Sequence, residues 1–156
     1  MRRKDKEVTD AERIARVIDG CQVCRLGFQD DKSVYVVPVN FGHVEREGRH
    51  VLYFHGASAG RKFDLIRKNG YAGFEMDTNY QLKSGETACK YTCTFQSIVG
   101  EGPIQVVEDP AEKRAGLVAI MRQSTGREQW TFSDEMVAAV CVSRLDVEML
   151  SCKEYR

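Results

Sequence analysis

The chain has 156 residues, of which 42% are hydrophobic and 29% are charged. This length fits one domain of ordinary size, with enough interior for a hydrophobic core that needs no disulfide bonds. The 23 basic and 23 acidic residues cancel, so no overall positive charge is present to attract a nucleic acid backbone. The composition excludes a disordered or low-complexity chain and predicts a single globular domain over residues 1–156.

Three features of the sequence bear on where the protein works. The charged residues 1–7 are followed by no apolar stretch of the kind found in secretion signals. The longest wholly apolar run, 136–142, is far shorter than the about 20 residues of a membrane helix. Six cysteines are too few for a disulfide framework. We therefore expect a cytoplasmic protein with reduced thiols, with neither a membrane nor a nucleic acid as a partner.

The first third of the chain changes from a helical pattern to strand patterns. Thr9 is predicted to cap a helix that ends at Gly20, because Glu12 completes a capping box and apolar residues follow at helical spacing. Short polar turns separate the strand-like segments that follow, which are 23–28, 34–41 and 50–55. Turns this short join neighbouring strands in antiparallel fashion, and Pro38 favours an edge strand or a bulge.

The remaining two thirds contain two more helical patterns and further strands. The predicted elements are a helix over 58–69, strands over 71–77 and 92–107, a helix from a capping box at 109–112 to Gly126, and a last strand or strand pair over 136–150. Gly100 and Gly102 are interpreted as bulges. About six antiparallel strands with three peripheral helices predict a mainly β fold that closes into a barrel, because closure removes exposed strand edges.

The most informative segment for function is 55–62, which leaves a strand and begins a helix. It places five small residues between His55 and the adjacent cations Arg61 and Lys62. Small side chains let an anion approach backbone N–H groups, and the helix N-terminus adds about half a positive charge. The segment predicts either a phosphate site or a glycine-rich turn before a solvated helix. A nucleotide-binding P-loop is not expected, because the glycine spacing is one residue short and Phe63 stands where a Ser or Thr would bind magnesium.

The cysteines and histidines leave several alternatives open. Two pairs of cysteines could bind zinc as thiolates in a small binding module, namely Cys21 with Cys24 and Cys89 with Cys93. Buried, inert thiols are the commoner case. His43 and His50 flank a turn and are expected in solvent. His55 lies beside the small-residue loop and is either a structural histidine or a catalytic one.

The order of several short segments along the chain points to a protein family. The segments are residues 24–27, 35–42 (YVVPVNFG), 52–55 (LYFH), 60–62 (GRK), 97–102 and 108–113, together with the opening residues 1–5. In this order they resemble the pyridoxamine 5′-phosphate oxidase-like flavin proteins, and within them the nitroimidazole-resistance type. The resemblance covers nearly the whole chain, and it depends on the order and spacing of the segments together.

The resemblance implies an antiparallel split β-barrel that binds flavin mononucleotide (FMN) at the interface of a homodimer. Arg61 and Lys62 match the family's phosphate-binding pair, and Ser97 matches a polar residue near the phosphate or the ribityl chain. The full set of implied FMN-binding residues is Val39, Asn40, Phe41, Phe54, His55, Gly60, Arg61, Lys62 and Ser97. His55 also matches a histidine that meets the substrate, which makes it the implied catalytic residue.

The function that the resemblance implies is an FMN-dependent oxidoreductase that reduces the nitro group of a small molecule over the flavin. No metal ligand belongs to this hypothesis. Two alternatives stay open. One is a non-catalytic flavin- or haem-binding protein on the same barrel, acting as a sensor or carrier, and the other is the zinc-stabilised binding module.

Overall fold

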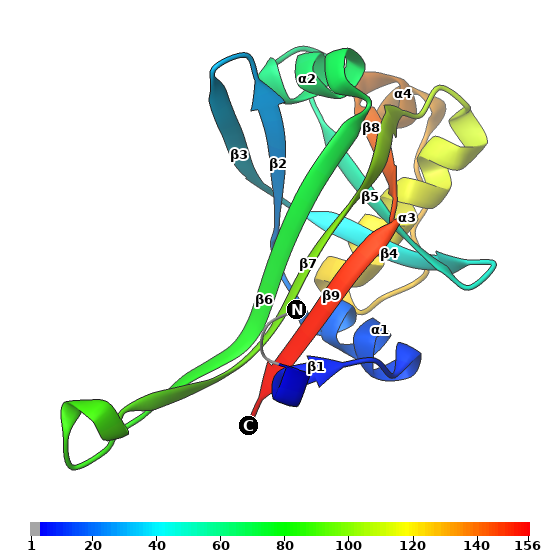
Figure 1. Ribbon diagram of the computed structural model, residues 1–156. Helices are drawn as coiled ribbons and strands as arrows, with labels where there is room; N and C mark the ends of the chain where they lie inside the picture. The colour runs from blue at the N-terminus through cyan, green and yellow to red at the C-terminus, as the bar shows by residue number, and fades with distance from the viewer. Residues whose placement is uncertain (1–3) are drawn as a thin grey trace.

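A computed structural model describes residues 4–156 as a nine-stranded antiparallel sheet with helices at its periphery (Figure 1). The strands are β1 (Glu7–Val8), β2 (Cys24–Asp30), β3 (Ser33–Val39), β4 (Phe41–Arg46), β5 (Arg49–Gly56), β6 (Tyr71–Lys83), β7 (Thr92–Val106), β8 (Cys141–Asp146) and β9 (Met149–Tyr155). The helices are α1 (Ala11–Gly20), α2 (Arg61–Asn69), α3 (Pro110–Thr125) and α4 (Asp134–Ala139), with 3₁₀ turns η1 (Lys4–Lys6) and η2 (Ala88–Lys90). Residues 1–3 of the segment 1–5 used for the family resemblance lie outside the described residues.

The sheet closes into a split barrel because β7 changes partners along its length. The main strand order is β3-β2-β6-β7-β8-β5-β4, and every pairing is antiparallel. Residues 95–101 of β7 pair with β9, whereas residues 104–106 pair with β8. The long strands β6 and β7 also extend beyond the barrel as an arm that carries η2 at its tip (Figure 1). The prediction of a mainly β, antiparallel split barrel with peripheral helices is confirmed.

Two hydrophobic cores meet on the two faces of β5. Leu52 and Phe54 belong to the core inside the barrel. Val51 and Tyr53 point the other way and belong to the core beneath α3 and α4. Leu52, Tyr53 and Phe54 are each 0% exposed, which means that this strand is buried on both faces.

The first helix is capped one residue later than the sequence predicts. The Asp10 carboxylate accepts a hydrogen bond of 2.8 Å from the backbone N–H of Arg13 and so performs the role assigned to Thr9. Glu12 lies 3.6 Å from Arg16 one turn along the helix, at i,i+4 spacing. Both Thr and Asp cap helices well, so the residue type alone does not decide which one caps a given helix.

The predicted start of α3 is confirmed, but Glu112 has a different partner from the one expected. Asp109 caps the helix through the N–H of Glu112 at 2.9 Å. The Glu112 carboxylate accepts hydrogen bonds of 2.8 Å from both Tyr53 and Arg144. Burial acts to raise the pKa of Glu112, yet these hydrogen bonds outweigh it and keep the pKa below its usual value. Glu112 thus fastens α3 to β5 and β8.

Two predicted segments combine different elements. The run 34–41 divides at Asn40 into β3 and β4, and β3 forms an edge of the sheet, as Pro38 favours. The prediction of a strand or strand pair over 136–150 is wrong in its first part, because residues up to Ala139 belong to α4. Ser133 caps that helix through the N–H of Met136 at 3.3 Å, and this local signal outweighs the apolar, strand-like composition.

Gly100 and Gly102 are not bulges, since they pair in register with Phe74 and Ala72. The register shift between β6 and β7 lies instead between Thr78 and Gln81. A Cβ atom on Gly102 would overlap the carbonyl oxygen of Asp146. Glycine is therefore needed here for close packing, which the sequence does not distinguish from a bulge.

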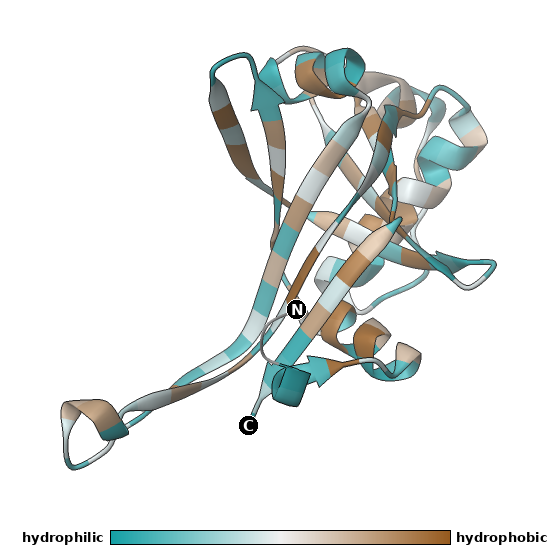
Figure 2. Ribbon diagram, viewed as in Figure 1, coloured by the Kyte–Doolittle hydropathy of each residue, from teal (hydrophilic) through white to brown (hydrophobic). Residues whose placement is uncertain are grey.

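The strand β3 is rich in apolar residues, which form brown bands along its ribbon in Figure 2. Val34 is 75% exposed and Val36 is 58% exposed.

None of the described helices is both long and apolar enough to span a membrane.

Gly42 provides a test of how closely α3 packs on β4. A Cβ atom at this position would overlap the backbone of Ala119 and Ile120, which cannot move aside without displacing the helix. We expect Gly42→Ala to lower the free energy of unfolding by about 1–3 kcal/mol, the usual range for overpacking. Urea unfolding measures the change. Gly20→Ala is the matched control, because its nearest heavy atom would be 3.7 Å away, and equal stability loss in both variants would contradict the prediction.

Candidate functional site

The predicted site lies where β5 ends and α2 begins, next to the edge strand β3. Gly60 caps α2 with a φ of 132°, which favours glycine, and its carbonyl accepts the N–H of Phe63 at 3.0 Å. Within residues 4–156, no side chain caps this helix start. The first N–H groups of a helix have no partner within it, so the loop presents backbone donors to a ligand.

Lys62, the second residue of α2, is a half-buried cation beside this loop. Its Nζ donates a hydrogen bond of 3.0 Å to the carbonyl oxygen of His55. Gly56 makes room for it, because a Cβ atom there would lie 3.1 Å from Nζ and 3.0 Å from the Phe63 ring. Burial lowers the pKa of Lys62. A positive charge that is partly removed from water gains from an anionic ligand.

Arg61 points away from the loop toward the turn between β2 and β3. Its guanidinium donates to the Asp30 carboxylate through Nε at 2.9 Å and Nη2 at 2.7 Å. It also lies over the Tyr35 ring, 4.5 Å from the ring centre. The adjacent cations that the sequence places together therefore have different partners in the folded chain.

His55 is the second unusual group of the site. Its Nδ1 atom is buried and has no hydrogen-bond partner among the described residues. Burial lowers the pKa of His55, and the charge of Lys62 lowers it further. A buried polar nitrogen without a partner costs about 1–3 kcal/mol, which a bound ligand that hydrogen-bonds to it would offset.

Two cavities meet at Lys62. The first, of about 340 Å³, is lined by Val23, Pro38, Val39, Asn40, His55 and Lys62. The second, of about 270 Å³, lies along the small-residue loop and is lined by Tyr35, Val37, Gly56, Ala57, Ala59, Gly60, Arg61, Lys62 and Phe63. Together they form a hollow between β3 and the start of α2.

The structure brings six of the implied residues to this hollow, namely Val39, Asn40, His55, Gly60, Arg61 and Lys62. Phe41 and Phe54 pair across β4 and β5 with their side chains in the barrel core, 1% and 0% exposed. Ser97 lies on β7 opposite Asp77 and Lys153 and lines neither cavity. A role of Ser97 at a flavin therefore stays a prediction.

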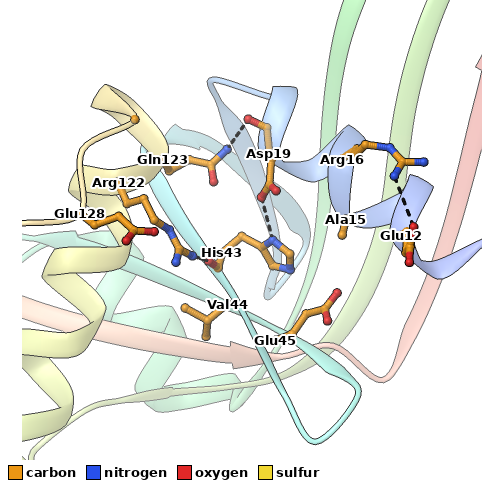
Figure 3. Close-up of a pocket in the computed structure, with 11 residues that line it drawn as sticks. Glu12, Ala15, Arg16, Asp19, His43, Val44, Glu45, Arg122, Gln123 and Glu128 are labelled. Atoms are coloured by element: carbon orange, nitrogen blue, oxygen red, sulfur yellow. Dashed lines mark hydrogen bonds and ion pairs between the residues drawn. The ribbon is translucent and has the colours of Figure 1, made fainter.

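The expectation that His43 and His50 lie in solvent is wrong. His43 is 4% exposed, and its ring nitrogens lie 3.0 Å from Asp19 and 3.0 Å from His50. The sequence does contain a signal for this contact, which is the spacing of the two histidines and Glu45. Residues 43 and 45 share one face of a strand, and residue 50 lies opposite residue 45 across a two-residue turn. His43 also lines a larger cavity, of about 710 Å³, between α1, α3 and β4 (Figure 3).

The four cysteines of the zinc hypothesis do not form a shared ligand cluster in the described part of the chain. Cys21 and Cys24 are buried in the barrel, and burial raises the pKa of Cys21 to about 12. Cys89 and Cys93 belong to the β6–β7 arm, away from the barrel (Figure 1). Cys21 and Cys24 are therefore buried, unreactive thiols, which is the commoner of the alternatives that the sequence left open.

These features define a split-barrel protein with a hollow at a strand-to-helix loop. The family model for pyridoxamine 5′-phosphate oxidase matches residues 10–154, and the chain belongs to this family. A search among proteins of curated function finds no match.

Solved structures agree with this assignment. A candidate 5-nitroimidazole antibiotic resistance protein of Bacteroides thetaiotaomicron is 30% identical, with a TM-score of 0.80 over 95% of this chain and 86% of that one. A flavocytochrome of Azotobacter vinelandii shares the fold at 23% identity and a TM-score of 0.79, over 100% and 72% of the chains. An FAD- and haem-binding protein of Mycobacterium smegmatis shares the fold at 17% identity and a TM-score of 0.82, over 97% of this chain and 74% of that one.

Proposed function

We propose that the protein binds FMN in the hollow around Lys62 and uses it to reduce a small molecule, with a nitro compound as the first substrate class to test. The observation that carries the proposal is that a half-buried cation lies at the same loop as a buried histidine nitrogen with no partner in the described part of the chain. The 30% identity to a candidate 5-nitroimidazole resistance protein supports the substrate class. The names of two further structural neighbours, which include flavin and haem, support a redox cofactor.

The residues of the hollow fit the chemistry of a flavin phosphate. Lys62 and the first N–H groups of α2 supply positive charge to the phosphate, and the glycines at 56 and 60 leave room for it. Arg61 contributes only when it shares or leaves the Asp30 carboxylate. The backbone of Val39 and Asn40 provides a wall for the ring system. The bound flavin supplies the electron transfer, and the protein supplies binding and orientation.

His55 is assigned to the substrate side of the site. Because its pKa lies below the usual value, the ring is neutral at neutral pH and acts through an N–H donor or a lone pair. A neutral imidazole orients a nitro group by hydrogen bonding without adding a charge. A protein that only carries a flavin has no substrate to orient in this way, and this difference separates a reductase from a flavin carrier.

A homodimer is the third part of the proposal. Val36 stands in one row across the sheet with Gly27, Gly73, Glu101 and Met149, as the strand register shows. Val36 and Met149 are 58% and 61% exposed, and the two glycines keep the row flat between them. Such a face suits a second copy of the chain.

The dimer is tested by Val36→Glu, which places a charge in the middle of this face. Light scattering at micromolar concentration should show a dimer for the unmodified protein and a monomer, or a dimer at least tenfold weaker, for the variant. Met136→Glu is the control, because Met136 is 60% exposed on α4 and does not belong to the row. A monomeric unmodified protein would contradict the proposal.

Cofactor binding is tested by Lys62→Met. Charge-assisted hydrogen bonds contribute about 1.5–3 kcal/mol, so we expect FMN to bind at least about tenfold more weakly. Lys68→Met, on the exposed end of α2 and paired with Asp31, should bind FMN as the unmodified protein does. Equilibrium dialysis with FMN, riboflavin and FAD completes the test. Riboflavin should bind more weakly than FMN, and equal affinities would refute the phosphate site.

The role of His55 is tested by His55→Gln. We expect the variant to retain FMN but to reduce a nitroimidazole at least about tenfold more slowly, because a positioned donor typically contributes 10²–10⁴-fold. Flavin content and turnover are measured on the same preparation. Unchanged turnover removes His55 from the site. A flavin-loaded protein with no turnover even before mutation indicates a carrier.

A further inference from the structure

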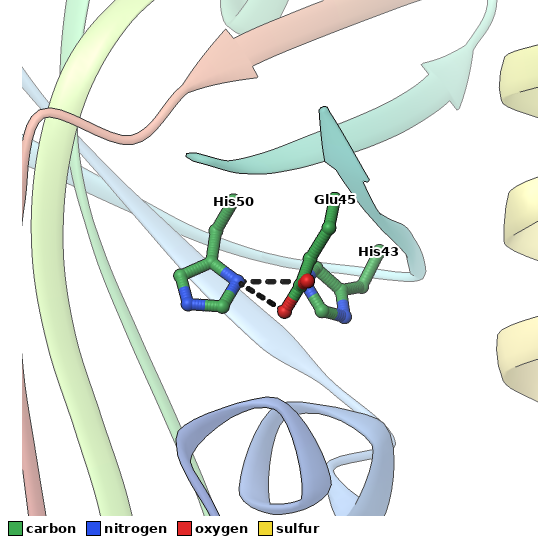
Figure 4. Close-up of side chains that lie close together, drawn as sticks. All are labelled: His43, Glu45 and His50. Carbon is green, nitrogen blue, oxygen red and sulfur yellow. Dashed lines mark hydrogen bonds and ion pairs between the residues drawn. The ribbon is translucent and has the colours of Figure 1, made fainter. Parts of the chain in front are cut away.

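Three metal-binding side chains converge at the opposite end of β5 from His55. His43 and Glu45 lie two residues apart on β4, and His50 on β5 pairs directly with Glu45. The connecting turn places Glu47 and Gly48 at φ values of 52° and 75°, as in the tight turns of β-hairpins. All three side chains consequently project from the same face of the hairpin toward α1 (Figure 4).

The distances among the ligand atoms approach those of a tetrahedral metal site. His43 Nε2 lies 3.0 Å from His50 Nδ1, and a Glu45 carboxylate oxygen lies 3.7 Å from the same Nδ1. Zinc bonds of about 2.0–2.2 Å at tetrahedral angles separate neighbouring ligand atoms by about 3.4 Å. Shifts of a few tenths of an ångström, well within side-chain motion, would place an ion among the three atoms.

Asp19 adds the outer support that metal-bound histidines usually have. Its carboxylate lies 3.0 Å from His43 Nδ1, the ring nitrogen that faces away from Glu45 and His50. A hydrogen bond from Nδ1–H to this carboxylate fixes the tautomer whose Nε2 lone pair can bind a metal, and it makes Nε2 more basic. The carboxylate, the histidine and the ring nitrogen that faces the other two ligands are therefore all supplied by one chain.

The surroundings favour a cation and leave it an open position. The large cavity beside His43 is lined by four acidic residues and two basic ones, namely Glu12, Asp19, Glu45 and Glu128 with Arg16 and Arg122. Arg122 donates to the His43 carbonyl, and Arg16 lies 3.6 Å from Glu12, so both arginines have acceptors of their own. Figure 3 shows His43 and Glu45 at the wall of this cavity, from which water can complete the coordination.

We propose that His43, Glu45 and His50 form a binding site for a divalent transition metal ion, with Zn²⁺ as the probe, and that Asp19 positions His43 for it. Two imidazoles and one carboxylate suit a borderline cation such as Zn²⁺ better than Ca²⁺ or Mg²⁺, which prefer oxygen ligands. Among the described residues, this is the group of His, Cys, Asp and Glu side chains that comes close enough to share one ion. The site is separate from the hollow around Lys62 and does not depend on the proposed flavin chemistry.

The test is calorimetric titration of chelator-treated protein with Zn²⁺ at pH 7.5. It uses a Cys89→Ser, Cys93→Ser background, because these thiols on the arm are not buried and each offers Zn²⁺ a ligand outside the proposed site. We expect one ion per chain. Glu45→Gln and His50→Gln should each weaken binding at least tenfold, and Asp19→Asn should weaken it by about 10–100-fold, as for other outer partners of metal ligands.

Glu47→Gln is the matched control, since it removes an exposed carboxylate from the turn of the same hairpin and should leave Zn²⁺ affinity unchanged. Glu45 is itself half exposed, so Glu45→Gln tests the site without risk to folding. Zn²⁺ should also raise the thermal unfolding midpoint of the background protein and not that of Glu45→Gln. FMN affinity should be the same in both. Absence of one-to-one binding, or equal affinity in Glu45→Gln and the background protein, would overturn the proposal.

Discussion

The burial of β5 on both of its faces is the constraint on which the rest of the structure depends. Leu52 and Phe54 fill the barrel, while Val51 and Tyr53 support α3. A shift of one residue would exchange these two sets and place each in the wrong core, so the register of the strand is strongly specified. The two ends of β5 are fixed as a consequence, with His50 at one end and the loop that follows His55 at the other.

Local electrostatics decide how much positive charge a chain without net charge presents at the hollow. Lys62 lies beside the backbone donors of α2 and is partly removed from water. Water therefore screens its charge less, and the attraction to a nearby negative charge is stronger. Arg61 has the same charge but is neutralised by Asp30. The effective charge at the hollow thus depends on which cation the fold pairs internally, and the composition contains no information on that pairing.

Local signals made much of the fold predictable. Asp109 with Pro110 starts α3, Gly126 ends it, and Gly70 ends α2, because capping depends on residues within one turn of each other. The loop from His55 to Lys62 was found for the same reason: a run of small residues before two cations is a local pattern. Where local signals compete, as at Thr9 and Asp10 or at the apolar run after Ser133, the prediction was displaced or wrong.

The sequence by itself therefore determined the mainly β class, the family and the neighbourhood of His55 and Lys62, since these follow from alternation, turns and short motifs. Only the tertiary structure decided which side chains meet across long separations. Asp30 reaches Arg61 from 31 positions away, and Asp19 reaches His43 from 24. Barrel closure brings such residues together, and it depends on the packing of all strands at once, which no short stretch of sequence encodes.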